Sequence, residues 1–111
     1  VDTDYVVNGS AKAFVNFNGE STIASRDSFN VGSLTDVATG TYNITFTNNL
    51  GNGNYTTSCA GGDTNAAGVM VCQPHDSLAP TTSVCRVASL QAHASQTDEP
   101  YIGAVIHGDL A

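Results

Sequence analysis

The side chains that could perform catalysis are few, and they lie in contexts that do not suit it. A nucleophilic serine often occupies a motif such as G-x-S-x-G, which the chain lacks. Two carboxylates could flank a glycosidic bond, as in glycosidases, and four aspartates are available: Asp27, Asp36, Asp63 and Asp98. Each lies in or beside a predicted turn, where aspartate commonly hydrogen-bonds the local backbone. The sequence therefore predicts a protein that is not an enzyme and needs no cofactor.

The sequence contains no pattern typical of a metal site. The chain has three histidines, and only PHD at 74–76 and HGD at 107–109 pair one of them with an acid. Histidine is the commonest metal ligand, but these spacings match no known ligand motif, so we expect ordinary histidines. One alternative stays open. In a homotrimer, His107 on the threefold axis would supply three ligands at once.

The three cysteines, Cys59, Cys72 and Cys85, do not form a recognisable framework. An odd number argues against a set of disulfides, and no C-x-x-C pair indicates zinc. Each cysteine lies in a strand-like run, so we expect small buried apolar side chains. A single disulfide is the alternative, and the sequence cannot say which two cysteines would form it.

Two polar loops are the best candidates for binding. TNNLGNGN at 47–54 and AGGDTNAAG at 60–68 are rich in amides and hydroxyls, which suit a neutral polar ligand such as a glycan. The alternative is that both are solvated hairpin tips. The tyrosines could stack on sugars, but most lie in strand-like runs, where burial is expected. The candidate receptor-binding residues are Asn48, Asn49, Asn52, Asn54, Asp63, Thr64 and Asn65.

Composition limits the possible partners. The 111 residues include 41% hydrophobic and only 12% charged side chains, and ten acids against Lys12, Arg26 and Arg86 give a net charge of −7. So few cations make nucleic acid an unsuitable partner and disfavour an anionic membrane surface. No apolar run approaches the roughly 20 residues of a membrane-spanning helix, so no membrane insertion is expected.

The chain predicts one all-β domain, an antiparallel β-sandwich of about eight strands, over residues 10–111. Residues 1–9 are expected to lead in from the preceding part of a longer parent chain. A helix near 87–95 is the local alternative to the seventh strand. The expected strands are 11–17, 22–26, 28–35, 41–47, 54–60, 67–73, 83–90 and 101–107.

Phe14 raises the question of what covers the first strand. In AKAFVNFNG at 11–19, Ala13, Val15 and Phe17 alternate with Lys12, Phe14 and Asn16, which predicts one buried face. The other face carries a large aromatic side chain. Phe14 lies either in the core of its own sandwich or at an interface with another copy of the chain, and we favour the interface.

The order of four stretches resembles a module of bacteriophage tail fibres and tail receptor-binding proteins. These stretches are KAFVNFNG at 12–19, the run from Ile23 to Asp36 that contains FNVGSLTD, GTYNITFT at 40–47 and NY at 54–55. ASRDS has one residue more than that pattern before its arginine, which predicts a β-bulge. Beyond residue 55 the resemblance rests on Arg86 after a Ser/Thr run and on the last strand.

The resemblance implies a C-terminal β-sandwich knob at the distal tail fibre of a virion. It is expected to be homotrimeric, intertwined or side by side, and to recognise a bacterial surface glycan or outer-membrane receptor. Three weak sites on one tip would bind a repetitive surface by avidity. A trimerising or capping module without receptor binding is the alternative. No receptor-binding residue transfers from the resemblance, because such modules vary in their loops.

Overall fold

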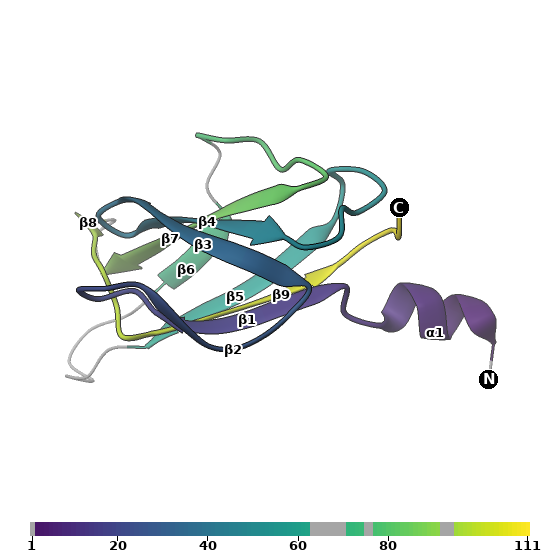
Figure 1. The fold of residues 1–111 in the computed structure, drawn as a ribbon, viewed down its shortest axis with the longest axis horizontal. Coiled ribbons are helices and arrows are strands. Elements are labelled where there is room, and N and C mark those ends of the chain that lie inside the picture. The colour runs from purple at the N-terminus through teal and green to yellow at the C-terminus, as the bar shows by residue number, and fades with distance from the viewer. Residues whose placement is uncertain (1, 63–70, 75–76, 92–94) are drawn as a thin grey trace.

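A computed structural model describes residues 2–62, 71–74, 77–91 and 95–111 of the chain (Figure 1). In these residues a short helix, α1 (Thr3–Gly9), precedes nine strands. The strands are β1 (Ala13–Asn18), β2 (Ala24–Phe29), β3 (Val31–Ala38), β4 (Thr41–Phe46), β5 (Thr56–Gly62), β6 (Val71–Pro74), β7 (Val84–Gln91), β8 (Ser95–Gln96) and β9 (Tyr101–His107).

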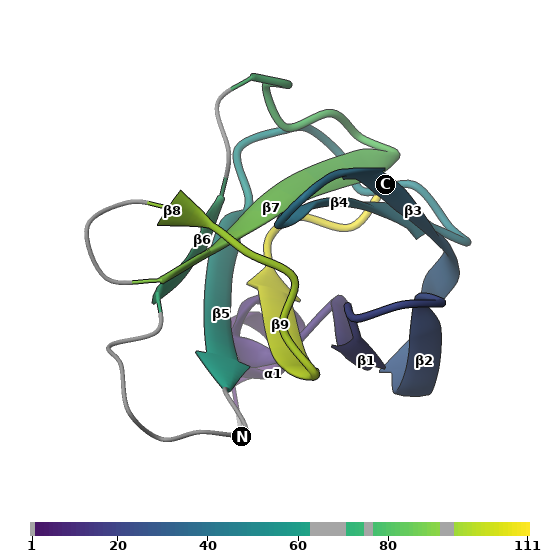
Figure 2. The same ribbon diagram turned by 90° about the vertical axis from the view of Figure 1, so that its left-hand side faces the viewer.

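The strands form two sheets, and every pairing within them is antiparallel. The first sheet has the order β2-β1-β9-β5, and the second has the order β3-β4-β7-β6, with β8 paired to β7. Figure 2 shows the two sheets as separate layers. The predicted antiparallel β-sandwich is therefore confirmed at the level of the fold.

The core forms between the inward-facing side chains of the two sheets. Strand β1 alternates buried and exposed residues, and β9 buries every second residue in the same way. Phe17 meets Tyr42 edge-to-face with ring centroids 5.2 Å apart, and Phe46 meets Tyr55 at 5.7 Å. This geometry is favourable for aromatic pairs and ties both sheets together. The buried core comprises Ala13, Val15, Phe17, Tyr42, Ile44, Phe46, Leu50, Tyr55, Cys85, Val87, Ile102, Ala104 and Ile106.

Each predicted strand range overlaps a strand of the structure, although residues 67–70 of the sixth range lie outside the described residues. The second and third strands lie two or three residues later than predicted. The chain turns at Asn30, whose φ is 56°, rather than at Asp27. Asparagine tolerates this left-handed conformation better than most residues. The helix considered for 87–95 is wrong for residues 87–91, because that stretch belongs to β7.

The predicted bulge is present in β2. Asp27 pairs with Asn16 and Ser25 pairs with Phe17, which leaves Arg26 as the extra residue between them. A bulge of this kind bends a strand and redirects the side chain at the extra position. The bulge therefore sets the direction of the Arg26 side chain at the edge of the first sheet.

Helix α1 was not predicted. Asp2 caps it, since its side chain accepts a hydrogen bond of 2.9 Å from the Asp4 N–H. The helix has no buried residue and extends away from the sandwich (Figure 1). Seven residues give too short a window for a helical periodicity to stand out from the sequence.

Candidate functional site

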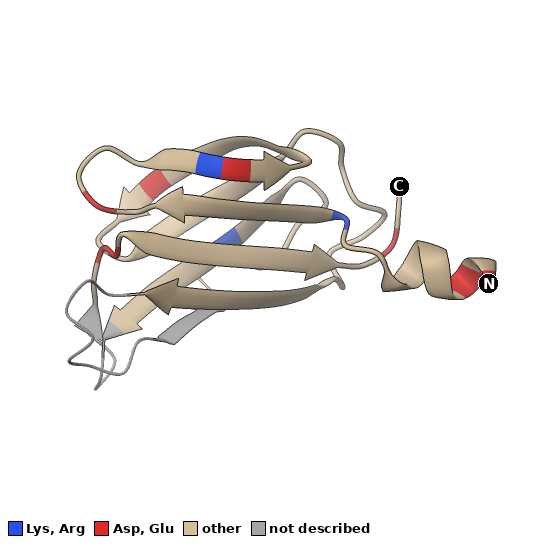
Figure 3. Ribbon diagram, turned by 90° about the horizontal axis from the view of Figure 1, so that it is seen from below, with Lys and Arg blue, Asp and Glu red and all other residues tan. Residues whose placement is uncertain are grey.

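The outer face of the first sheet is the most distinctive surface of the sandwich. It carries the residues that alternate with the core positions of β1, β9 and β5, and those three strands contain no Asp, Glu, Lys or Arg. Figure 3, which views this face, shows charged bands on β2, at its edge. We define the outer face by Asp27, Phe29, Phe14, Asn16, Tyr101, Gly103, Val105, Ser58, Ala60 and Gly62.

Phe14 lies on this outer face. Its side chain is 37% exposed and stacks on Phe29, which is 54% exposed, with ring centroids 6.1 Å apart. The alternative that Phe14 fills the core of its own sandwich is therefore wrong. Lys12, which was expected on the same face, is instead buried, and its Nζ donates a hydrogen bond to the carbonyl of Ser10.

Exposed apolar side chains gather at the α1 end of the molecule, next to the Phe14–Phe29 pair. A cavity of about 590 Å³ lies beside it, between α1, Phe29 and the chain after β4. Its lining includes Leu50 from the core and Asn48 from the first candidate loop. We call the exposed apolar side chains Val6, Val7, Phe14, Phe29 and Leu110 the end patch.

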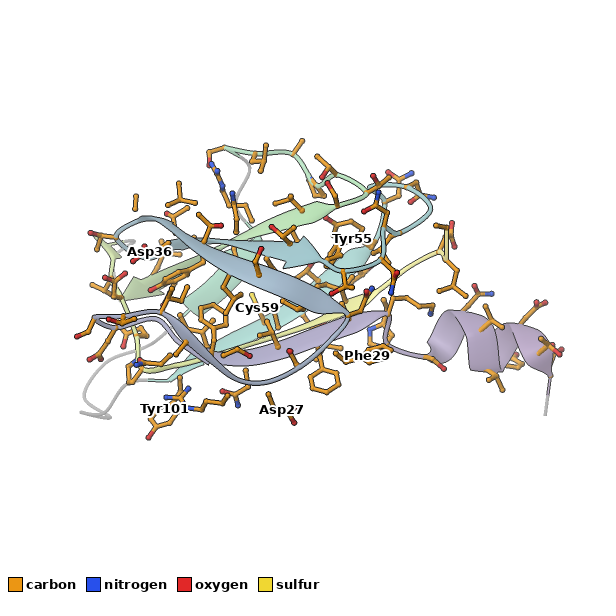
Figure 4. All side chains as sticks on the ribbon, in the orientation of Figure 1. Asp27, Phe29, Asp36, Tyr55, Cys59 and Tyr101 are labelled. Atoms are coloured by element: carbon orange, nitrogen blue, oxygen red, sulfur yellow. The ribbon has the colours of Figure 1, made fainter. Side chains whose placement is uncertain are left out.

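The opposite end of the outer face holds an arginine stacked on a tyrosine. The guanidinium carbon of Arg26 lies 4.6 Å from the centroid of the Tyr101 ring. Two further contacts fix the guanidinium: one nitrogen donates to the Pro100 carbonyl at 2.6 Å, and the other donates to Asn16 Oδ1 at 3.3 Å. In Figure 4, Tyr101 and Asp27 point away from the sandwich on the same side.

Beside this pair the outer face is hollow. One cavity, of about 310 Å³, is lined by Tyr101, Asn16 and the backbone around Gly62. A second, of about 450 Å³, continues it towards Phe14 and Ser58, and both share Asn16, Ala60 and Gly103. We call the two together the trough. Sequence reasoning missed it, although the small residues at outward positions of β5 and β9 were a signal that could have found it.

The first candidate loop is held mainly by hydrogen bonds to residues outside it. The Asn48 N–H donates to Asn30 Oδ1 at 2.7 Å, and the Asn30 amide donates to the Asn48 carbonyl at 3.1 Å. Asn52 donates to Asp109 Oδ2 at 3.0 Å and accepts from the Asn54 N–H at 2.8 Å. Asn48, Asn49 and Asn54 are exposed. The Asn52 side chain therefore ties the loop to Asp109, in the segment after β9.

The first candidate loop precedes β5, and the second begins at the other end of that strand. Asp63, Thr64 and Asn65 lie outside the described residues, but Gly62, just before them, ends β5, whereas the first loop precedes its start at Thr56. A seven-residue strand is about 23 Å long. The structure thus does not bring the first loop close to the start of the second.

The histidine and acid candidates show no catalytic or metal-binding arrangement in the described part of the chain. His107 is half-buried on β9, opposite Thr56. Among the described residues, no three His, Cys, Asp or Glu side chains group closely enough to hold a metal ion. Asp27 Oδ1 accepts a 2.9 Å hydrogen bond from the Ser28 N–H, as expected for an aspartate that binds local backbone. His75, His93 and Asp63 lie outside the described residues.

A buried polar cluster closes the sandwich near the turn at 38–41. The Tyr42 hydroxyl lies 2.8 Å from Asp98 Oδ1, to which it can donate, and 3.1 Å from the Gly19 carbonyl. Asp98 Oδ1 also accepts from the Gly40 N–H at 2.8 Å. Burial, reinforced by the hydrogen bond to Asp98, raises the pKa of the Tyr42 hydroxyl well above its ordinary value. This neutral tyrosine has a structural role.

Cys85 is a buried thiol, as predicted for a small apolar side chain. Its Sγ lies 3.5 Å from Thr57 Oγ1, and burial raises its pKa. Cys59 is half-buried and packs against the core. Cys85 forms no disulfide in this structure, and the side chain of Cys72 lies outside the described part.

The described part of the chain thus defines an antiparallel β-sandwich with a hollowed, largely uncharged outer face. None of its helices is long and apolar enough to cross a membrane. The chain matches no protein-family model, and it shows no significant similarity to a curated protein or to a solved structure. A function must therefore be argued from its own residues.

Proposed function

We propose that this chain is a β-sandwich module of a bacteriophage tail fibre or tail receptor-binding protein. In this role it recognises the host surface without catalysing a reaction, and its partner is a bacterial surface glycan or an outer-membrane receptor. The observation that carries the proposal is the order and spacing of the four motifs between residues 11 and 55.

The motif residues have structural roles, which explains why they would recur in such a module while the loops vary. Gly19 lies against Tyr42, and a Cβ there would come within 2.4 Å of the tyrosine oxygen. Asn30 turns the chain between β2 and β3, and its amide also donates to the Lys12 carbonyl at 3.0 Å. The motif residues thus hold the scaffold together. The receptor would then be bound by surface residues outside the motifs or by exposed side chains within them.

Self-association into a homotrimer is part of the proposal. The end patch leaves Phe14 and Phe29 in water, and α1 has no buried residue. A helix of seven residues is marginal in water without packing, so contacts with other copies would stabilise it. Three copies that bury their end patches would present three equal binding surfaces in one virion tip, and avidity would follow.

A structural role is the second candidate. The end patch alone would suffice for a trimerising or capping module of a tail protein that does not itself bind a receptor. The two candidates predict different behaviour of the isolated chain, since only an adhesin binds cells.

Adhesion can be tested with the purified, fluorescently labelled chain. We expect it to bind cells of at least one strain in a panel of bacteria and to slow adsorption of a phage to that strain. Heat-denatured chain is the control. Failure to bind any strain or to compete with any phage would contradict adhesion, and an assembly defect on deleting the module from its parent fibre would then favour the structural role.

A further inference from the structure

We propose that the trough on the outer face of the first sheet binds a neutral oligosaccharide, with the Tyr101 ring as its stacking platform. This inference rests on the proposed adhesive function. It moves the recognition site from the loops at 48–54 and 61–66 to the surface of the sheet.

The shape of the trough is the first argument. Ala60 and Gly103 face each other across β5 and β9, and the next outward pair is Gly62 and Tyr101. Three small residues beside one large ring leave a step in the surface, and the two cavities of about 310 and 450 Å³ lie there. These volumes lie within the range of small-ligand sites, about 300–1,000 Å³.

The rigidity of the Tyr101 ring is the second argument. The Tyr101 side chain is 54% exposed, so a ligand can reach its ring. Arg26 stacks on it and is itself fixed by Asn16 and the Pro100 carbonyl. At Gly62, on the neighbouring strand β5, no side chain blocks the approach to the ring. An ordered ring loses little conformational entropy on binding, so more of the contact energy appears as affinity.

The polarity of the trough selects a sugar. The strands β1, β9 and β5 carry no charged residue, and the guanidinium of Arg26 is already occupied by three partners. Hydrogen-bonding groups lie around the apolar floor: the Asn16 amide, the Ser58 hydroxyl and, at the edge, the Asp27 carboxylate. A sugar ring combines an apolar C–H face, which suits an aromatic ring, with hydroxyls that suit amides and carboxylates.

A second copy of the chain is the competing occupant. It would gain most by burying large apolar side chains, and these gather at the Phe14–Phe29 end, where Phe14 also lines the larger cavity, whereas the smaller cavity beside Tyr101 is lined by small and polar residues. The face thus divides into an end that suits self-association and an end that suits a polar ligand.

The sharpest variant is Gly103→Leu, which fills the trough without touching the core. A Cβ at Gly103 would have nothing nearer than the Val15 carbonyl oxygen at 3.9 Å, and the residue is half-exposed. The fold should therefore be kept, as circular dichroism and urea unfolding would check. The matched control is Thr35→Leu. Thr35 follows Leu34, which packs on the core, and so it places an equal side chain on the outer face of the other sheet.

Binding would be measured first on a printed array of neutral oligosaccharides from bacterial capsules and O-antigens. The tightest binder would then be titrated by NMR. We expect Gly103→Leu and Tyr101→Ala to weaken binding by at least about tenfold, since each removes ring stacking or space. Tyr101→Phe should retain most of the affinity because it keeps the ring, and Thr35→Leu should bind as the wild type does.

Three outcomes would overturn the inference. If an oligosaccharide binds equally to wild type and Gly103→Leu, the glycan site lies elsewhere, although adhesion stands. If no oligosaccharide on the array binds while the chain still binds cells, the receptor is not a neutral glycan. If Gly103→Leu dissociates an oligomer that Thr35→Leu leaves intact, a second copy covers the trough. If the wild-type chain binds no cells at all, the proposed adhesive function itself is contradicted.

Discussion

At the scale of single residues, the Asn30 side chain links the β2–β3 corner to two other segments of the chain, at Lys12 and at Asn48. Asn30 holds a φ of 56° and its side chain bonds Lys12 and both backbone groups of Asn48. A left-handed conformation is strained for most residues, and the bond to Lys12 is half-buried, whereas the two bonds to Asn48 are exposed. The corner between the two sheets therefore depends on one asparagine.

We expect Asn30→Ala to lower the free energy of unfolding by about 2–4 kcal/mol, because it combines backbone strain with lost hydrogen bonds. Asn30→Gly is the matched variant, since glycine adopts this φ without strain and loses only the hydrogen bonds. It should cost less than the alanine variant in urea unfolding. Equal losses for the two variants would show that backbone strain contributes nothing.

The buried tyrosines make stability depend on pH in alkali. Burial raises the pKa of Tyr42 and of Tyr55 above their ordinary value of 10.0, so above this pH the unfolded chain releases protons that the folded chain keeps. Each group then lowers the free energy of unfolding by up to about 1.4 kcal/mol per pH unit. Tyr42→Phe should flatten this decline between pH 10 and 11.5 relative to wild type. If the free energy of unfolding of Tyr42→Phe, measured by urea unfolding, falls with pH as steeply as that of the wild type, the assignment to Tyr42 is contradicted.

At the scale of elements, β1 has two faces with different roles. Phe17 is fully buried between the sheets, whereas Phe14, three positions earlier, lies on the outer face and contacts Phe29. The same residue type on the same strand thus belongs to the core in one case and to the surface in the other. Substitutions at Phe17 and at Phe14 therefore report separately on the core and on the outer face.

We expect Phe17→Ala to destabilise the monomer by about 3–5 kcal/mol, the usual cost of emptying a core site. Phe14→Ala should cost about 1 kcal/mol or less, since it loses one exposed ring contact. Urea unfolding at low protein concentration would measure both. A cost for Phe14→Ala as large as that for Phe17→Ala would contradict the outward position of Phe14.

At the scale of the whole molecule, the end patch and the Tyr101 end of the trough lie at different ends of the first sheet, and Phe14 lines the part of the trough between them. The end patch adjoins α1, and the smaller cavity of the trough lies beside Tyr101 towards the other end, in a molecule 44 Å long. This separation would let copies associate through one end and bind a ligand through the other.

The proposed homotrimer predicts a molar mass of about 34 kDa by light scattering, three times the 11.4 kDa of one chain. We expect the double variant Phe14→Ser/Phe29→Ser to shift towards one chain while keeping its circular dichroism, because the end patch would lose its two largest side chains. Val37→Ser, which removes an exposed valine from β3, is the control and should leave the mass unchanged. A wild-type mass of one chain would contradict the trimer.

The sequence by itself determined the sandwich and eight of the described strands, two of them displaced by two or three residues, because alternation and turn residues act over a few positions. The bulge at Arg26 followed from the extra residue relative to the tail-fibre pattern, and β8 was not predicted. The sequence also placed Phe14 on the face opposite the core positions of the strand, but did not show whether that face is covered by its own sandwich. Only the tertiary structure decided that Phe14 is outward, that Lys12 is buried and that α1 has no buried residue. The trough also depends on the tertiary structure. The Arg26 guanidinium that stacks on Tyr101 is held by the Pro100 carbonyl, 74 residues away in the chain. Such contacts follow from how strands pair and sheets stack, and no local pattern encodes them.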